Sequence, residues 1–165
     1  MSLQQINLTK RSGASEAYQV AKVKAIIGHA TKGLNVNPLA LESKFNETIY
    51  DGMPTSAVSD NLTHHARTMC SPEEPEWTIA AGRLETFSMW AETGAYDVPF
   101  TGYLSAQKFK GRYTHPAIFD AYSPADQAEL GALINRERDT DHSYGSVLTA
   151  KKKYCLLYTS DAADE

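Results

Sequence analysis

The chain has 165 residues, of which 42% are hydrophobic and 22% are charged, and its formal net charge at pH 7 is −4. This length allows one domain of ordinary size, or a small domain with part of a second one. The near-neutral charge balance argues against a dedicated nucleic-acid-binding domain, which would show a basic stripe.

Residues 6–20 predict a β-hairpin. Polar and apolar residues alternate from Ile6 to Lys10, and Ser12-Gly13 supplies a turn with a glycine where a positive φ is needed. A second short run extends from Glu16 to Val20. We expect a helix to follow, with Gly33 as its C-cap. Its inward face would comprise Val20, Val23, Ile26, Ile27 and Ala30.

Basic residues gather where this hairpin meets the helix. Lys22 lies near the predicted helix N-terminus, where free N–H groups and the helix dipole favour anions. Arg11 offers a planar fork for phosphate oxygens, and Lys10 a point charge. Glu16 and Gln19 offer an acceptor and an amide that can contact a base or a sugar. These residues alone leave two interpretations open, a phosphate pocket or the more common solvated basic surface.

Three more amphipathic helices are predicted before residue 94. Asn37-Pro38 begins the first, and Thr55 or Ser56 caps the second. Ser71 opens a capping box before the third, although Pro75 places the regular helix a little later. The inward faces would be Leu41, Phe45 and Ile49, then Val58, Leu62, Ala66 and Met69, then Trp77, Ala80, Leu84, Phe87 and Ala91.

Amphipathic helices of this length bury their apolar stripes only against one another and the hairpin. The sequence therefore predicts an α+β fold, a four-helix bundle capped by a small two- to three-stranded sheet. The third strand would come from the turn over Tyr50–Pro54.

The second half of the chain predicts less regular structure. Residues 98–113 are rich in glycine and tyrosine without a sustained period, which indicates a connection. A short helical segment over His115–Ala121 follows, and Ser123-Pro124-Ala125-Asp126 caps another helix. Leu130, Leu133 and Ile134 would lie inside it. We interpret residues 136–139 and 151–153 as solvated charge runs, and we expect residues 114–154 to be loosely packed in isolation.

Several motifs resemble, in order and spacing, the ATP-cone at the N-terminus of the large chain of ribonucleoside-diphosphate reductase. They are Lys10-Arg11-Ser12-Gly13, Glu16, Lys22, Tyr50–Ser56, Ala80–Leu84 and Phe87. Further motifs are similar to the opening of that chain's N-terminal helical domain, namely Glu137-Arg138-Asp139, Ser143-Tyr144, Leu148 and Lys153-Tyr154. The resemblance implies an ATP-cone-like domain over residues 3–97, a connection over 98–113 and a truncated helical domain over 114–154.

In that family the cone binds ATP or dATP as an allosteric effector and sets overall activity. The resemblance implies that Lys10 and Arg11 face the phosphates, Glu16 faces the nucleoside, and Thr55 offers its hydroxyl and nearby backbone at a helix start. The matching positions are Leu8, Lys10, Arg11, Glu16, Gln19, Lys22, Thr55 and Val58.

Three positions depart from the family's pattern. Gln19 stands where an asparagine is usual, Ser59 where a histidine is usual, and Ala91 where a phosphate-facing lysine is usual. A charge-assisted hydrogen bond is worth ~1.5 to 3 kcal/mol, about tenfold to a hundredfold in affinity. We therefore hypothesise a degenerate cone that binds nucleotide weakly or not at all.

The resemblance also implies a parent enzyme that reduces ribonucleotides to deoxyribonucleotides for DNA synthesis. Its partners would be a radical-generating small subunit and a second large chain, with no nucleic acid and no membrane. The family's catalytic barrel lies later in the sequence, so we expect this chain to be inactive alone. We assign it no catalytic residue, no metal and no cofactor besides the effector.

Two alternatives come from other classes of protein. A stand-alone nucleotide-sensing ATP-cone protein with a preceding zinc ribbon would need paired CxxC motifs, and residues 1–7 contain no cysteine. A structural helical module whose basic hairpin binds nothing is the stronger competitor. Nucleotide titration separates it from a working sensor.

Residues 155–165 are identical to the translation of a common sequencing-library adapter, so we expect an artefactual tail on an N-terminal fragment. Without the tail, 16 basic residues stand against 17 acidic ones, a net charge of −1. Cys70 is then the remaining thiol, and it fits no zinc spacing with His64 and His65. We expect His65 at the edge of the core and His64 in water. A polar N-terminus and the lack of a bilayer-length apolar run predict a cytoplasmic protein.

Overall fold

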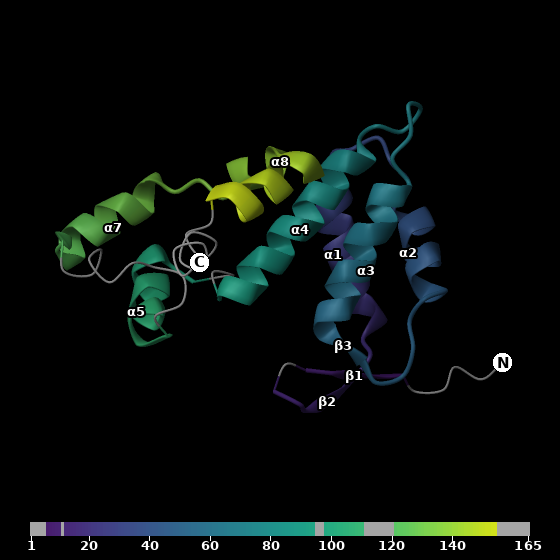
Figure 1. Ribbon diagram of the computed structural model, residues 1–165, viewed down its shortest axis with the longest axis horizontal. Coiled ribbons are helices and arrows are strands. Elements are labelled where there is room, and N and C mark those ends of the chain that lie inside the picture. Colours follow the sequence, from purple (N-terminus) through teal and green to yellow (C-terminus); the bar gives the residue numbers. More distant parts are fainter. Residues whose placement is uncertain (1–5, 11, 95–97, 111–120, 155–165) are drawn as a thin grey trace, which may run out of the picture.

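Four helices pack side by side, and a small sheet closes one end of them (Figure 1). The computed structural model describes residues 6–10, 12–94, 98–110 and 121–154. The helices are α1 (Val20–Thr31), α2 (Pro38–Asn46), α3 (Thr55–Thr68) and α4 (Trp77–Thr93). The predicted α+β fold, a helical bundle capped by a sheet, is confirmed.

The sheet has three strands in the order β2-β1-β3. Strands β1 (Asn7–Thr9) and β2 (Ser15–Ala17) form the predicted antiparallel hairpin, with Gly13 at φ +81° in the turn. Strand β3 (Met53–Pro54) pairs with β1 in parallel. Helix α1 starts three residues after β2, and α3 starts directly after β3. Both helices therefore begin at the sheet, on either side of β1.

The core lies between the four helices and the inner face of the sheet. Val20 and Ile26 are 46% and 38% exposed, so the prediction that they face inward was wrong. Ile26 lies about 100° around the helix from Ile27, off the buried stripe, and Val20 is the first residue of its helix. The core residues are Val23, Ile27, Ala30, Leu41, Phe45, Met53, Val58, Leu62, Ala66, Trp77, Ala80, Ala81 and Leu84.

The predicted inward face of α4 is confirmed from Trp77 to Leu84 but not at its end. Phe87 is partly buried against the core, whereas Ala91 is exposed. The buried residues of α4 end at Thr86, because its last turns extend past the part that the other helices cover. Ala91 therefore lies on an open part of the last turns of α4.

The starts of the helices follow local chemistry in two cases and tertiary structure in a third. The Asn37 side chain accepts a hydrogen bond from the Leu39 N–H at 3.1 Å, as the predicted cap requires. The Ser71 hydroxyl accepts one from the Glu74 N–H, yet α4 begins only at Trp77, as Pro75 indicated. The prediction that Thr55 or Ser56 caps α3 was wrong. The N-cap is Pro54, because β3 continues into α3 with no intervening loop.

The second half of the chain forms more helix than predicted. Helix α5 (Phe100–Lys110) occupies most of the expected connection over residues 98–113. The sequence did not predict this helix, because it contains a glycine and its apolar residues follow a helical period only weakly. Its Leu104 is nevertheless buried. Of the predicted segment over His115–Ala121, all but Ala121 lies outside the described residues, as do residues 155–165. Within the described ranges, no helix combines the length and the apolar character that crossing a bilayer requires.

Helix α7 (Pro124–Leu133) has the predicted capping box between Ser123 and Asp126. It packs against α5, where a side chain on Gly131 would meet Phe100. The predicted inward residues Leu130, Leu133 and Ile134 are instead 39%, 77% and 50% exposed. Because α7 contacts α5 at its glycine, its larger apolar residues point elsewhere.

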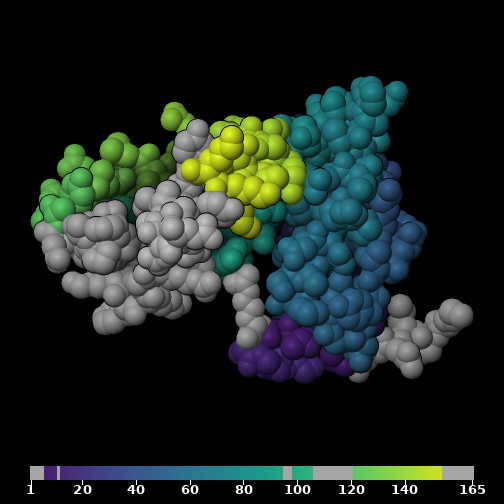
Figure 2. All heavy atoms as spheres, in the orientation of Figure 1, coloured from purple at the N-terminus to yellow at the C-terminus, as the bar shows by residue number. Residues whose placement is uncertain are grey.

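The last described elements dock on the outer face of α4. They are η1 (Arg138–Asp141), α8 (Tyr144–Thr149) and η2 (Ala150–Tyr154). Figure 2 shows this segment, in yellow, lying directly on α4, in teal. Gly82 permits the approach, because a Cβ there would lie 2.1 Å from the His142 carbonyl oxygen. The expectation of loose packing does not hold for this segment.

Polar contacts of α3 and α4 complete this docking. The Arg83 guanidinium donates to the carbonyl oxygens of Thr140, Ala30 and Lys32 at 2.9, 3.1 and 2.7 Å. It thus joins the C-terminal end of α1 to η1. The Arg67 guanidinium lies 4.5 Å from the centre of the Tyr144 ring, a cation–π contact.

Gly82→Ala should destabilise the protein by about 1 to 3 kcal/mol, because the new methyl group overlaps the backbone of residues 142–144. Urea denaturation measures the change. Gly28→Ala is the matched control, because Gly28 lies in α1 with open space around it and alanine should stabilise that helix by up to about 1 kcal/mol. Equal stability of Gly82→Ala and the parent protein would contradict the docking.

Candidate functional site

One carboxylate and two ammonium groups meet where the hairpin joins the bundle. Lys10 follows β1, Glu16 lies at the centre of β2, and Lys22 lies in the first turn of α1. Glu16 Oε2 is 2.9 Å from Lys10 Nζ, and Glu16 Oε1 is 2.6 Å from Lys22 Nζ. The Glu16 side chain is 25% exposed, against 50% and 61% for the two lysines. We call these three residues the Lys–Glu–Lys cluster.

The electrostatics of the cluster are set by the lysines. Hydrogen bonds from Lys22 and then from Lys10 lower the pKa of the Glu16 carboxyl to about 2. Glu16 is therefore ionised at every pH at which the protein would work. The cluster has one net positive charge, and both of its cations are accessible to water.

Two helix N-termini flank the cluster. Gln19 is the N-cap of α1 and Pro54 the N-cap of α3, and neither helix has a side-chain cap or an acidic residue in its first turn. The two helices follow the outer strands of the three-stranded sheet, α1 after β2 and α3 after β3, so their starts lie on either side of β1. Free N–H groups and the helix dipole favour an anion at each start.

The remaining site residues predicted from the sequence differ in how far their side chains are buried. Thr55, the first residue of α3, is partly buried, and Gln19 is exposed. Val58 is 6% exposed and belongs to the core. Leu8, which pairs with Glu16 across the two strands, packs on the core from β1. Arg11 lies outside the described residues. The structure thus gathers Lys10, Glu16 and Lys22, and it uses Leu8 and Val58 as supports.

The structure also shows where two of the three residues that differ from the family's pattern lie. Ser59 is partly buried in the second turn of α3, and Ala91 is exposed near the C-terminal end of α4. That end of α4 points to the same side of the bundle as the hairpin (Figure 1). Neither side chain brings a charge to the site.

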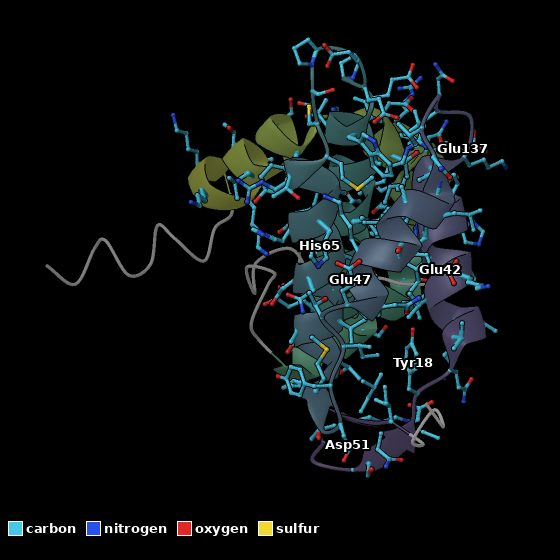
Figure 3. The ribbon with its side chains drawn as sticks, turned by 90° about the vertical axis from the view of Figure 1, so that its right-hand side faces the viewer. Tyr18, Glu42, Glu47, Asp51, His65 and Glu137 are labelled. Carbon is cyan, nitrogen blue, oxygen red and sulfur yellow. The ribbon has the colours of Figure 1, made fainter. Side chains whose placement is uncertain are left out.

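Two residues near the cluster were not singled out from the sequence. Tyr18 is partly buried beneath the bundle, with its ring centre 6.4 Å from that of Phe45 (Figure 3). Burial and then the charge of Glu42 raise the pKa of its hydroxyl. The period of two in β2 could have found Tyr18, because it places that residue on the same face as Glu16.

Asp51 is the second such residue. Its carboxylate accepts a hydrogen bond from the Asn7 N–H at 2.8 Å, and the Thr9 hydroxyl donates to the Gly52 carbonyl at 3.0 Å. These bonds fix the turn before β3 against β1. No local signal in the sequence indicated this contact, because its partners are 44 residues apart.

The histidines lie as predicted. His64 is exposed, and His65 is partly buried, with Nε2 3.1 Å from the Thr48 hydroxyl. Burial and then the neighbouring His64 lower the pKa of His65. In the part of the chain that the structure describes, no group of three His, Cys, Asp or Glu side chains could hold a metal ion.

Comparison with known proteins finds large chains of ribonucleoside-diphosphate reductase. The chain is 32% identical over 155 residues to the ribonucleoside-diphosphate reductase subunit alpha of Synechocystis sp., which covers 92% of this chain. It is 28% identical to the subunit alpha of enterobacteria phage T4 and 25% identical to the reductase 1 subunit alpha of Escherichia coli, each over 93% of this chain. The chain spans about a fifth of the length of these relatives. No protein-family model matches it.

The lowered pKa of Glu16 gives a direct test of the cluster. The carboxyl carbon of Glu16 should keep the NMR shift of an ionised group from pH 7 down to about pH 3. In Lys22→Gln the midpoint should rise towards 4.5, because the strongest hydrogen bond to the carboxylate is lost. The pairing stabilises the fold above pH 4.5, and that contribution disappears as the pH falls towards 2. A midpoint between 4 and 5 in the parent protein would show that the lysines do not hold Glu16.

Proposed function

Because the chain matches the N-terminal part of a ribonucleoside-diphosphate reductase large subunit, we propose that it is the regulatory region of such a subunit. Lys10 and Lys22 of the Lys–Glu–Lys cluster, with the starts of α1 and α3, bind the triphosphate of ATP or dATP, which acts as an allosteric effector. The observation that supports this most is the meeting of Lys10 and Lys22 beside two helix starts that have no side-chain cap. Ammonium groups and free N–H groups are the donors that phosphate oxygens prefer.

The same geometry argues for weak binding. Ala91 offers no cation on α4, and Glu16 already neutralises one of the two positive charges of the cluster. Each charge-assisted hydrogen bond that a phosphate does not receive costs ~1.5 to 3 kcal/mol of binding free energy. The site therefore fits an effector of low affinity.

The proposed role of the effector is to choose between arrangements of the large subunit. A ligand shifts such an equilibrium only by the difference in its affinity for the two states. The parent protein would reduce ribonucleoside diphosphates, with a radical-generating small subunit and a second large chain as partners. The reacting residues would lie beyond this chain, whose role is regulation.

A structural module that binds nothing is the second candidate. It is favoured by one observation, that Glu16 satisfies both lysines without a ligand. The two candidates differ in whether the isolated protein binds a triphosphate. Calorimetry decides between them.

Titration of the full chain with dATP should show binding, weaker than micromolar, and titration with adenosine should show none. Lys22→Gln should weaken dATP binding about tenfold or more, because a direct phosphate donor is lost. Lys24→Gln is the matched control, because Lys24 lies in the same helix but pairs with Glu42, 3.2 Å away. Equal effects of the two substitutions, or no heat with dATP, would favour the structural module.

Ala91→Lys should strengthen dATP binding about tenfold to a hundredfold, because it returns a cation to the last turns of α4. The position is exposed, so a lysine fits without disturbing the core. Ala91→Gln controls for side-chain length without charge. The idea of a weakened site fails if the parent protein already binds dATP at micromolar concentration.

A further inference from the structure

Glu16 lies where a bound anion would lie. Its two carboxylate oxygens are divided between the two lysines, Oε2 to Lys10 and Oε1 to Lys22. We propose that Glu16 is a resident anion of this site, which an incoming polyphosphate must displace from both lysines. This inference rests on the proposed function and adds to it an autoinhibitory contact within the site.

The backbone geometry lets Glu16 release the lysines without unfolding the sheet. Glu16 is the middle residue of β2 and pairs with Leu8 of β1, so its backbone position is fixed by the hairpin. Its side chain is partly exposed and can rotate away while the strand stays in place. The displaced carboxylate would remain at the rim of the site.

The lysines remain approachable while they are paired. Their side chains are 50% and 61% exposed, twice or more the exposure of Glu16. Exposed ion pairs of this kind are weak, so a stronger anion can replace the carboxylate. A phosphate group can therefore reach each ammonium from the solvent.

Displacement makes the site selective for highly charged ligands. A singly charged anion that replaces Glu16 gains little, since it exchanges one negative charge for another. A polyphosphate can contact both lysines and also the free N–H groups at the start of α1, the helix of Lys22, which no side chain caps. The resident carboxylate thus keeps small anions out at a modest loss of affinity for the proper ligand.

Glu16→Gln in the full chain, titrated with inorganic tripolyphosphate at low salt, tests the proposal. Tripolyphosphate has no nucleoside, so any contact of Glu16 with a base or sugar does not enter the measurement. Affinity should rise about 3- to 10-fold, because two exposed ion pairs no longer compete. Glu42→Gln is the matched control, since it removes the same charge from a carboxylate that pairs with Lys24, and it should change affinity less than twofold.

The outcomes separate this inference from the proposed function. Tighter binding by Glu16→Gln supports it, even where the parent protein shows no measurable binding. Unchanged or weaker binding by Glu16→Gln, with binding by the parent protein, overturns the resident anion and leaves the effector site standing. Absence of binding by both proteins overturns both ideas. Glu16→Ala, checked for folding by circular dichroism, should reproduce the gain if Glu16→Gln is unstable.

Discussion

The central position of β1 in the sheet is the constraint on which the candidate site depends. Pairing with β2 on one side and β3 on the other places the starts of α1 and α3 at the same end of the bundle. Lys10, at the end of β1, then lies within reach of the first turn of α1 through Glu16. If β3 did not pair with β1, the second helix start would have no fixed place near the cations.

Helix α4 has two roles in the same molecule. One face closes the core through Trp77, Ala80 and Leu84, and another receives the segment from η1 to η2. The second role depends on Gly82, where the two backbones approach too closely for any side chain, and on the three carbonyls that Arg83 binds. Helix α4 thus joins the core of the bundle to the segment from η1 to η2.

Charge balance within the cluster connects the fold to its proposed role. Two lysines with one carboxylate form a site that is stable when empty, because no cation faces another without a counter-ion. In the proposed effector site the same pairing would limit the affinity for a triphosphate, and the absence of a charge at Ala91 would limit it further. Weak, charge-selective binding of this kind would suit the proposed effector role, because an effector must leave as its concentration falls.

Local chemistry in the sequence determined the hairpin, the Asn37 and Ser123 caps and the buried stripes of the first four helices. These features depend on residues a few positions apart, so they can be predicted from spacing alone. Tertiary structure decided the features that join distant residues. It paired β3 with β1, which made Pro54 the cap of α3 in place of Thr55, and it left Ala91 exposed. It also laid residues 138–154 on Gly82, because close approach between segments far apart in the chain leaves no periodic trace in either one. The pairing of Glu16 with Lys10 and Lys22 joins residues that are near in sequence, and it depends on how the hairpin meets α1.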